Sequence, residues 1–201
     1  MDSAWRIIGI DPGTRHVGYG VVESRGRSLI RLASGCVAAS DSPLPARLAM
    51  IFRTLREVME AYAPEAAAVE TVFSGKNPKT AIAIGEGRGV AVLAAAERGL
   101  EVRGYEPALV KRAVAGSGRA GKEQMRRMVG ILLSLREPPA TDHEADALAL
   151  AITHARHMEM RFLAGGGRAA ALRARPERGR LPEAVLRQLP AECLDGRGKR
   201  R

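Results

Sequence analysis

Cysteine, aromatic residues and long apolar runs are all scarce in this sequence. The two cysteines, Cys36 and Cys193, lie far apart among 201 residues, which argues against a disulfide framework. Aromatic residues make up 3% of the chain, and no apolar run approaches the roughly 20 residues of a membrane span. No signal-peptide pattern is present. We therefore expect a protein without a membrane span, in a reducing cytoplasm.

Acidic residues are also few relative to basic ones. The chain has 32 Lys and Arg against 22 Asp and Glu, a formal net charge of +10, which favours a polyanionic partner such as nucleic acid. Residues 155–201 alone hold 12 basic and 5 acidic side chains. We expect a domain over residues 1–160 and a basic, flexible tail over 161–201. The tail fits a solubilising extension as well as a non-specific DNA-binding arm.

The first third of the chain carries the pattern of three strands and a helix. Apolar runs cover Arg6–Asp11, His16–Glu23 and Leu29–Ala38, and short turns that contain glycine separate them. This spacing predicts an antiparallel meander. From Pro45 the apolar residues recur at helical spacing, so an amphipathic helix follows.

The remaining elements alternate between short strands and helices. A crossover helix that leads into Ala66–Val69 implies that this strand pairs in parallel with the first one. The pattern then predicts a helix over Pro78–Arg98, a strand over Leu100–Tyr105, and helices over Pro107–Ala115, Gly121–Leu135 and from Thr141 onward. The sequence thus predicts an α/β fold, in which helices flank a mixed sheet made of a three-strand antiparallel meander and parallel strands.

The final predicted helix has a clear start signal. In Thr141-Asp142-His143-Glu144 the Thr141 hydroxyl can accept the backbone N–H of Glu144, whose side chain reaches back, as in a capping box. With Thr141 as the N-cap, His143 and Asp146 project from one face near the helix start.

Three acidic residues occupy comparable positions in this plan. Asp11 and Glu70 each end an apolar strand, and Asp146 lies on the final helix. Converging carboxylates repel one another, and a divalent cation supplies the missing counter-charge. Oxygen ligands favour Mg²⁺ or Mn²⁺, and two such ions roughly 3.5–4 Å apart can promote phosphodiester hydrolysis. The alternative for Asp11 is a simple turn-starting role beside Pro12-Gly13.

Three motifs carry a family resemblance. They are IGIDPGTRHVGYGVVE at residues 8–23, VETVFSGKNPKTAIAIGEGRGV at 69–90 and DHEADALALAITH at 142–154. Together, and in this order, they resemble the RuvC-type Holliday-junction resolvases. The resemblance implies a ribonuclease-H-like fold, a homodimer, and symmetric nicking of four-way DNA junctions in recombination and repair. It also implies two Mg²⁺ ions per subunit, with Mn²⁺ as a substitute, and cooperation with the RuvA–RuvB branch-migration complex.

The resemblance assigns the metal-binding acids residue by residue. Asp11, Glu70 and Asp146 match the family's catalytic carboxylates. His143 stands where many relatives have Asp, and its imidazole could bind a metal or orient the attacking water. A nitrogen ligand would suit Mn²⁺ better than Mg²⁺. The neighbouring Asp142 could complete the site instead, and the sequence leaves this choice open.

Three further residues match DNA-contacting positions of the family. Phe73 corresponds to an aromatic that stacks on an unpaired base near the crossover, although a lone Phe after a strand is more often a core residue. Lys111 and Lys122 match basic positions near the cleavage site and could neutralise charge on the scissile phosphate. Gly85 and Gly89 would let a partner helix approach closely in the dimer.

Two other classes of function share parts of this pattern. The GIDPGT turn also resembles the phosphate loop of actin-like and sugar-kinase ATPases, but those folds need a second lobe for which the chain has no room. A non-catalytic junction-binding protein is the second alternative, and the intact acids argue against it. We therefore predict an endonuclease in which an activated water attacks phosphorus in line and leaves 5′-phosphate and 3′-hydroxyl ends.

Overall fold

The computed structural model describes residues 4–39, 42–71 and 78–162. In chain order their elements are β1 (Ala4–Asp11), β2 (His16–Arg25), β3 (Ser28–Ala38), α1 (Leu44–Tyr62), β4 (Ala66–Glu70), α2 (Pro78–Glu97), β5 (Glu101–Tyr105), α3 (Pro107–Ala115), α4 (Lys122–Leu132) and α5 (Asp142–Arg161). Within these ranges, every strand and helix predicted from the sequence pattern is present.

The strands form one mixed sheet in the order β3-β2-β1-β4-β5. β2 is antiparallel to both β1 and β3, whereas β4 is parallel to β1 and β5. The predicted combination of meander and parallel strands is therefore confirmed. In the register of the central pair, Ile10 lies opposite Val69, so the next residues along, Asp11 and Glu70, reach the same edge of the sheet.

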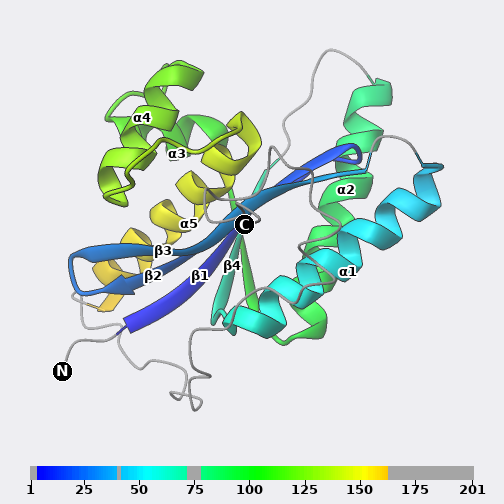
Figure 1. The fold of residues 1–201 in the computed structure, drawn as a ribbon, viewed down its shortest axis with the longest axis horizontal. Coiled ribbons are helices and arrows are strands. Elements are labelled where there is room, and N and C mark those ends of the chain that lie inside the picture. The colour runs from blue at the N-terminus through cyan, green and yellow to red at the C-terminus, as the bar shows by residue number, and fades with distance from the viewer. Residues whose placement is uncertain (1–3, 40–41, 72–77, 163–201) are drawn as a thin grey trace, which may run out of the picture.

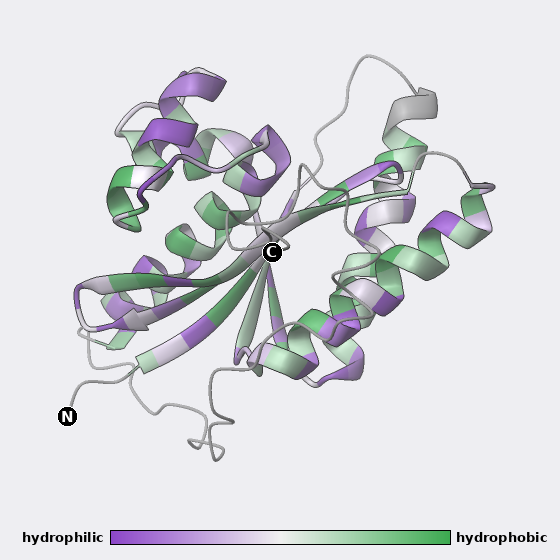
Figure 2. Cartoon of the chain, viewed as in Figure 1, coloured by the Kyte–Doolittle hydropathy of each residue, from purple (hydrophilic) through white to green (hydrophobic). Residues whose placement is uncertain are grey.

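Helices cover both faces of this sheet. Figure 1 shows α1 and α2 on one face and α3, α4 and α5 on the other. Because successive side chains of a strand point to opposite faces, neighbouring residues of β1 enter different cores: Ile8 packs in the core with Leu55 of α1, and Ile7 packs in the core with Leu148 of α5. In Figure 2 hydrophobic residues concentrate along the strands and on the helix faces that meet them.

The helix α5 lies unusually close to the sheet. A Cβ placed on Gly9 of β1 would stand 1.9 Å from the carbonyl oxygen of Ala147, and one placed on Gly18 of β2 would stand 1.9 Å from that of His143. No side chain fits at either position, so backbone meets backbone. These two glycines set the height of α5 above the sheet, and with it the position of the residues at the helix start.

The predicted boundaries hold within two residues except at the end of α4. α4 ends at Leu132 rather than Leu135, because Ser134 adopts a left-handed backbone with φ of 50°. Its N–H donates to the carbonyl of Ile131, and that of Leu135 donates to the carbonyl of Gly130, the paired bonds of a Schellman stop. α5 begins as predicted after the N-cap Thr141, whose hydroxyl accepts the N–H of Glu144.

Within the described ranges no helix is both long and apolar enough to cross a membrane. Phe73 and nearly all of the predicted tail, residues 163–201, lie outside the described residues. The division into a domain over 1–160 and a basic tail therefore stays a prediction.

Candidate active site

The sheet brings the predicted site residues to one edge. Asp11 is the last residue of β1 and Glu70 the last residue of β4, and both carboxylates are partly buried. The first turns of α5 lie over this edge and contribute His143 and Asp146. Four side chains from two strands and one helix are thus gathered in one region, as the resemblance implied.

The shortest contact in the site joins β1 to α5. Nδ1 of His143 lies 2.6 Å from Oδ2 of Asp11. This hydrogen bond is the first cause of a raised His143 pKa, burial opposes it, and the nearby carboxylate charges add to it. Asp11 therefore holds the ring with Nδ1 turned toward its own carboxylate.

Glu70 stands in a strongly perturbed environment. Burial raises its pKa, and the negative charges of Asp11 and Asp146 raise it further. The positive charge of Lys111 works in the opposite direction, and the resulting pKa is about 7. A carboxyl group with this pKa is protonated in a fraction of the molecules at neutral pH, and a nearby cation would ionise it fully.

Asp146 shows the same kind of perturbation. Burial again comes first, followed by the charges of Asp11 and Asp142, and these raise its pKa to about 6 despite His143 and Lys122. The carboxylates of the site therefore repel one another across short distances. Perturbed acids that gather at one place are typical of functional sites.

The two predicted lysines lie beside these acids. Lys111 of α3 is close enough to Glu70 to lower its pKa. Nζ of Lys122, at the start of α4, lies 3.0 Å from Oδ2 of Asp142, and this hydrogen bond is the main cause of a raised Lys122 pKa. Asp142 is thus paired with a lysine, whereas His143 contacts Asp11.

The donor set suits a divalent metal ion. Three mutually repelling carboxylates and one imidazole offer hard oxygen ligands together with one nitrogen. Among residues 4–39, 42–71 and 78–162 no three acidic, His or Cys side chains are already close enough to hold one ion, so the ligands would have to close around a cation as it binds. The charge and chemistry fit such a group.

One neighbour of the site was missed by the sequence reasoning. The ring of His16 stacks on that of His143, with centroids 5.6 Å apart and planes 9° from parallel. A signal for it did exist, because the predicted hairpin of the first two strands brings the start of β2 close to Asp11. The motif reading gave His16 no role, since only the acids of that motif were followed.

The site is open to the surface. The side chain of His143 is 46% exposed and that of Asp11 15%. A hollow of about 800 Å³ lies elsewhere, between β5, α3 and α5, and its lining includes Tyr105, His157 and Met160 but none of the four predicted metal-site residues. An accessible cluster of acids suits the backbone of a large polymer better than an enclosed small molecule.

A mixed sheet of this order, with acids at the ends of its two central parallel strands and on a helix laid across them, defines the ribonuclease-H-like nucleases. Comparison with known proteins narrows this class. The sequence model described as "Crossover junction endodeoxyribonuclease RuvC" matches residues 7–154. The chain belongs to the RuvC family of crossover junction endodeoxyribonucleases.

Individual relatives agree with this assignment. The RuvC proteins of Moorella thermoacetica and Azorhizobium caulinodans are 52% and 47% identical to this chain, over 74% and 76% of its length and 90% of theirs. The structure titled "T. thermophilus RuvC in complex with Holliday junction substrate" is similar with a TM-score of 0.73 and 39% identity, over 78% of this chain and 96% of that one. The yeast mitochondrial Holliday junction resolvase shares the fold at 14% identity and a TM-score of 0.57.

Proposed function

We propose that this protein resolves Holliday junctions by hydrolysing one phosphodiester in each of two strands, in recombination and DNA repair. The observation that carries the proposal is the convergence of Asp11, Glu70, His143 and Asp146 at one open edge of the sheet, in a member of the RuvC family. Its substrate is four-way junction DNA, and its location is the cytoplasm.

The cofactor in this proposal is a pair of divalent ions, Mg²⁺ or Mn²⁺. Asp11, Glu70, Asp146 and His143 would hold them, and they would supply charge stabilisation and an activated water. The imidazole of His143 is the natural fourth ligand, because Asp142 is paired with Lys122. Nitrogen ligation favours Mn²⁺ over Mg²⁺.

The side chains of the chain itself do three things in this reaction. Asp11 orients the His143 ring through the 2.6 Å contact. Glu70, whose pKa is raised to about 7 without a cation, would be ionised once the ions bind and would serve as one of their ligands. Lys111 and Lys122 place positive charge beside the acids, where a scissile phosphate gains negative charge as the water attacks in line. The products carry 5′-phosphate and 3′-hydroxyl ends.

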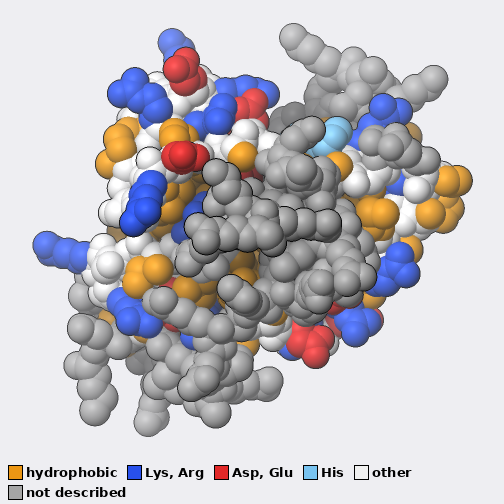
Figure 3. Space-filling view, in the orientation of Figure 1, with side chains coloured by type: hydrophobic (Ala, Val, Ile, Leu, Met, Phe, Trp, Pro, Cys, Tyr) orange, Lys and Arg blue, Asp and Glu red, His pale blue; other side chains and the backbone are white. Residues whose placement is uncertain are grey.

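DNA binding uses the basic surface around the site. Figure 3 shows Lys and Arg side chains gathered over α3 and α4 in this view, the helices that carry Lys111 and Lys122. Phe73, three residues after Glu70, is the proposed base-stacking residue. The Phe73→Ala variant should weaken junction cleavage and leave metal binding and folding intact, whereas unfolding would favour a core role.

The proposed enzyme is a homodimer, since a two-fold axis presents identical sites to two strands. α2 offers a suitable contact face, with Ile82 63% and Leu93 54% exposed. A Cβ added to Gly85 or Gly89 would meet nothing within 4 Å, so a second helix can approach the backbone. Cooperation with the RuvA–RuvB complex belongs to the same proposal.

The dimer is tested by a charge placed in this face. The variant Leu93→Asp should run as a monomer in sedimentation equilibrium while its circular dichroism matches wild type. Glu97→Asp on the same helix is the control. A wild type with a concentration-independent monomer mass would contradict the dimer.

The function is tested by nicking of a labelled four-way junction in Mg²⁺ and in Mn²⁺, with a linear duplex as control. Paired cuts that disappear in Asp11→Asn are expected. His143→Ala should lose most of the activity and Asp142→Asn little, which decides between the two candidate ligands. Tight junction binding with no cuts in either metal would instead support a binding protein.

A further inference from the structure

The side chain of Glu144 lies between His143 and Asp146 in sequence but points away from the acids. It is 3% exposed. Its Oε1 accepts the hydroxyl of Ser34 at 2.6 Å and lies 3.7 Å from Nη1 of Arg31. Both partners belong to β3, so this carboxylate ties the first turn of α5 to the far strand of the meander.

The second carboxylate oxygen of Glu144 holds the chain just before the helix. Oε2 accepts the backbone N–H of Ala140 at 2.9 Å, and the N–H of Glu144 itself donates to Oγ1 of Thr141 at 3.1 Å. The forward bond of the predicted capping box is therefore present, but the carboxylate returns to Ala140, one residue before the N-cap Thr141.

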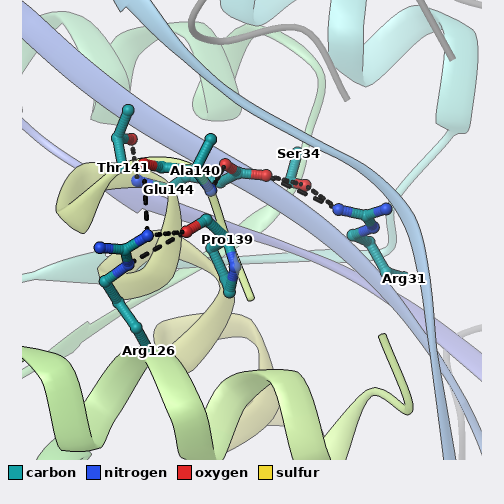
Figure 4. Close-up of polar contacts among 7 residues, drawn as sticks. All are labelled: Arg31, Ser34, Arg126, Pro139, Ala140, Thr141 and Glu144. Atoms are coloured by element: carbon teal, nitrogen blue, oxygen red, sulfur yellow. Dashed lines mark hydrogen bonds and ion pairs between the residues drawn. The ribbon is translucent and has the colours of Figure 1, made fainter. Parts of the chain in front are cut away.

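The same segment is also held from α4. The Arg126 guanidinium donates to the carbonyl of Pro139 through Nε at 3.0 Å and Nη2 at 2.7 Å. Figure 4 shows these contacts as one row from Arg31 and Ser34, through Glu144, to Arg126. The start of α5 is thus fixed from β3 on one side and from α4 on the other.

We propose that Glu144 is a positioning residue for the metal site, a proposal that rests on the proposed function. A cap needs only the Thr141 hydroxyl and one acceptor. Glu144 does more, because its buried charge is matched by hydrogen bonds to β3 and to Ala140, and a buried carboxylate with complete partners holds a fixed place.

The residue before Glu144, His143, must keep Nδ1 2.6 Å from Asp11 Oδ2. Asp146 must face Glu70 from the same helix. Loss of the network would let the first turn of α5 shift. The ligands supplied by α5 would then be less well placed, and the affinity for metal would fall before the fold is lost.

The test compares Glu144→Ala with Glu144→Gln. Gln keeps an acceptor for Ala140 and a polar contact with Ser34, so it should restore most of the function. Mn²⁺ binding to the DNA-free full-length protein is measured by the electron paramagnetic resonance signal of free Mn²⁺, and the metal concentration for half-maximal nicking is measured beside it. Residues that hydrogen-bond metal ligands typically change affinity by about 10–100-fold, and Glu144 acts one step further out, by holding the helix turn that carries His143 and Asp146. We expect a loss of about 10-fold or more for Glu144→Ala and a change below about 3-fold for Glu144→Gln.

A stability control separates positioning from folding. Ile152→Ala, in the buried part of α5, lowers stability by about 2–5 kcal/mol through a cavity and should leave Mn²⁺ affinity unchanged. If Glu144→Ala binds Mn²⁺ as wild type does while Asp146→Asn abolishes nicking, the positioning role is wrong and the proposed function stands. If Asp146→Asn nicks junctions as the wild type does, the proposed function itself is wrong. A loss of affinity in Ile152→Ala equal to that in Glu144→Ala would reduce the effect to stability alone and overturn the proposal.

Discussion

Replacement of Gly18 by alanine tests whether the height of α5 above the sheet controls cleavage. The added Cβ would lie 1.9 Å from the carbonyl oxygen of His143 and 2.5 Å from its carbonyl carbon. Both are backbone atoms, so no rotamer relieves the clash. To restore an ordinary contact of 3.4 Å the first turn of α5 must retreat by roughly 1.5 Å, because interiors are close-packed.

Such a shift acts on the most sensitive distance of the site. The contact of 2.6 Å between His143 Nδ1 and Asp11 Oδ2 would lengthen beyond hydrogen-bond range. Misplacement by about 1 Å typically costs about 10²-fold in rate, and overpacking costs about 1–3 kcal/mol of stability. We therefore expect Gly18→Ala to fold, to melt several degrees lower, and to nick junctions about 100-fold more slowly.

The matched control is Gly20→Ala on the same strand and face. Its Cβ would meet the Leu148 side chain at 2.7 Å (Cδ2) and 2.8 Å (Cγ) and the Leu148 backbone N at 3.0 Å, so a side chain further along α5 takes most of the strain. Stability should fall by a similar amount while nicking, measured well below both melting temperatures, stays near wild type. A Gly18→Ala enzyme with wild-type rate and metal requirement would refute the reasoning.

Three other outcomes follow from buried and exposed charges. The pKa of His154 is lowered to about 4 by burial, by His157 and by two arginines. The contribution of neutral His154 to stability is therefore complete above about pH 6.5 and is lost as the pH falls toward 4. In urea unfolding at pH 5 the free energy of unfolding should be about 2 kcal/mol lower because of this group, and His154→Gln should remove that pH dependence. Glu23→Gln removes the negative charge that lies 2.9 Å from the buried Arg6 guanidinium and should cost about 3–5 kcal/mol in the same assay, with a loss below 1 kcal/mol contradicting a tight pair. Lys122→Ala breaks only an exposed pair, so stability should change by less than about 0.5 kcal/mol, while the log–log salt slope of junction binding should fall by about 1 if this lysine contacts phosphate.

Much of the fold was predictable because its signals are local. The strand pattern of the first 38 residues, the change to helical spacing at Pro45, and the crossover into β4 each follow from the order of apolar residues along the chain. The capping box at Thr141 fixed the start of α5 for the same reason. The end of α4 was misplaced because nothing in the side chain of Ser134 announces a left-handed backbone, a conformation that glycine signals more clearly.

The same distinction between local and long-range signals applies to the residues of the candidate site. Asp11, Glu70 and Asp146 stand at element ends that the pattern locates, so their approach to one another could be expected. The contact of His143 with Asp11 and the stacking of His16 depend on where α5 crosses the sheet, which close packing of backbone determines. The reach of Glu144 to Ser34 links residues far apart in the chain and has no local signal.

The hydrogen bond between Asp11 and His143 joins residues 132 positions apart. In the proposed mechanism, cleavage therefore depends on α5, the last helix described, which leaves the ribosome after every described strand has been made. A nascent or prematurely ended chain that lacks α5 holds Asp11 and Glu70 but neither His143 nor Asp146. Contacts of such long sequence separation slow folding, so the proposed metal site is completed only once α5 has been made and has packed on the sheet.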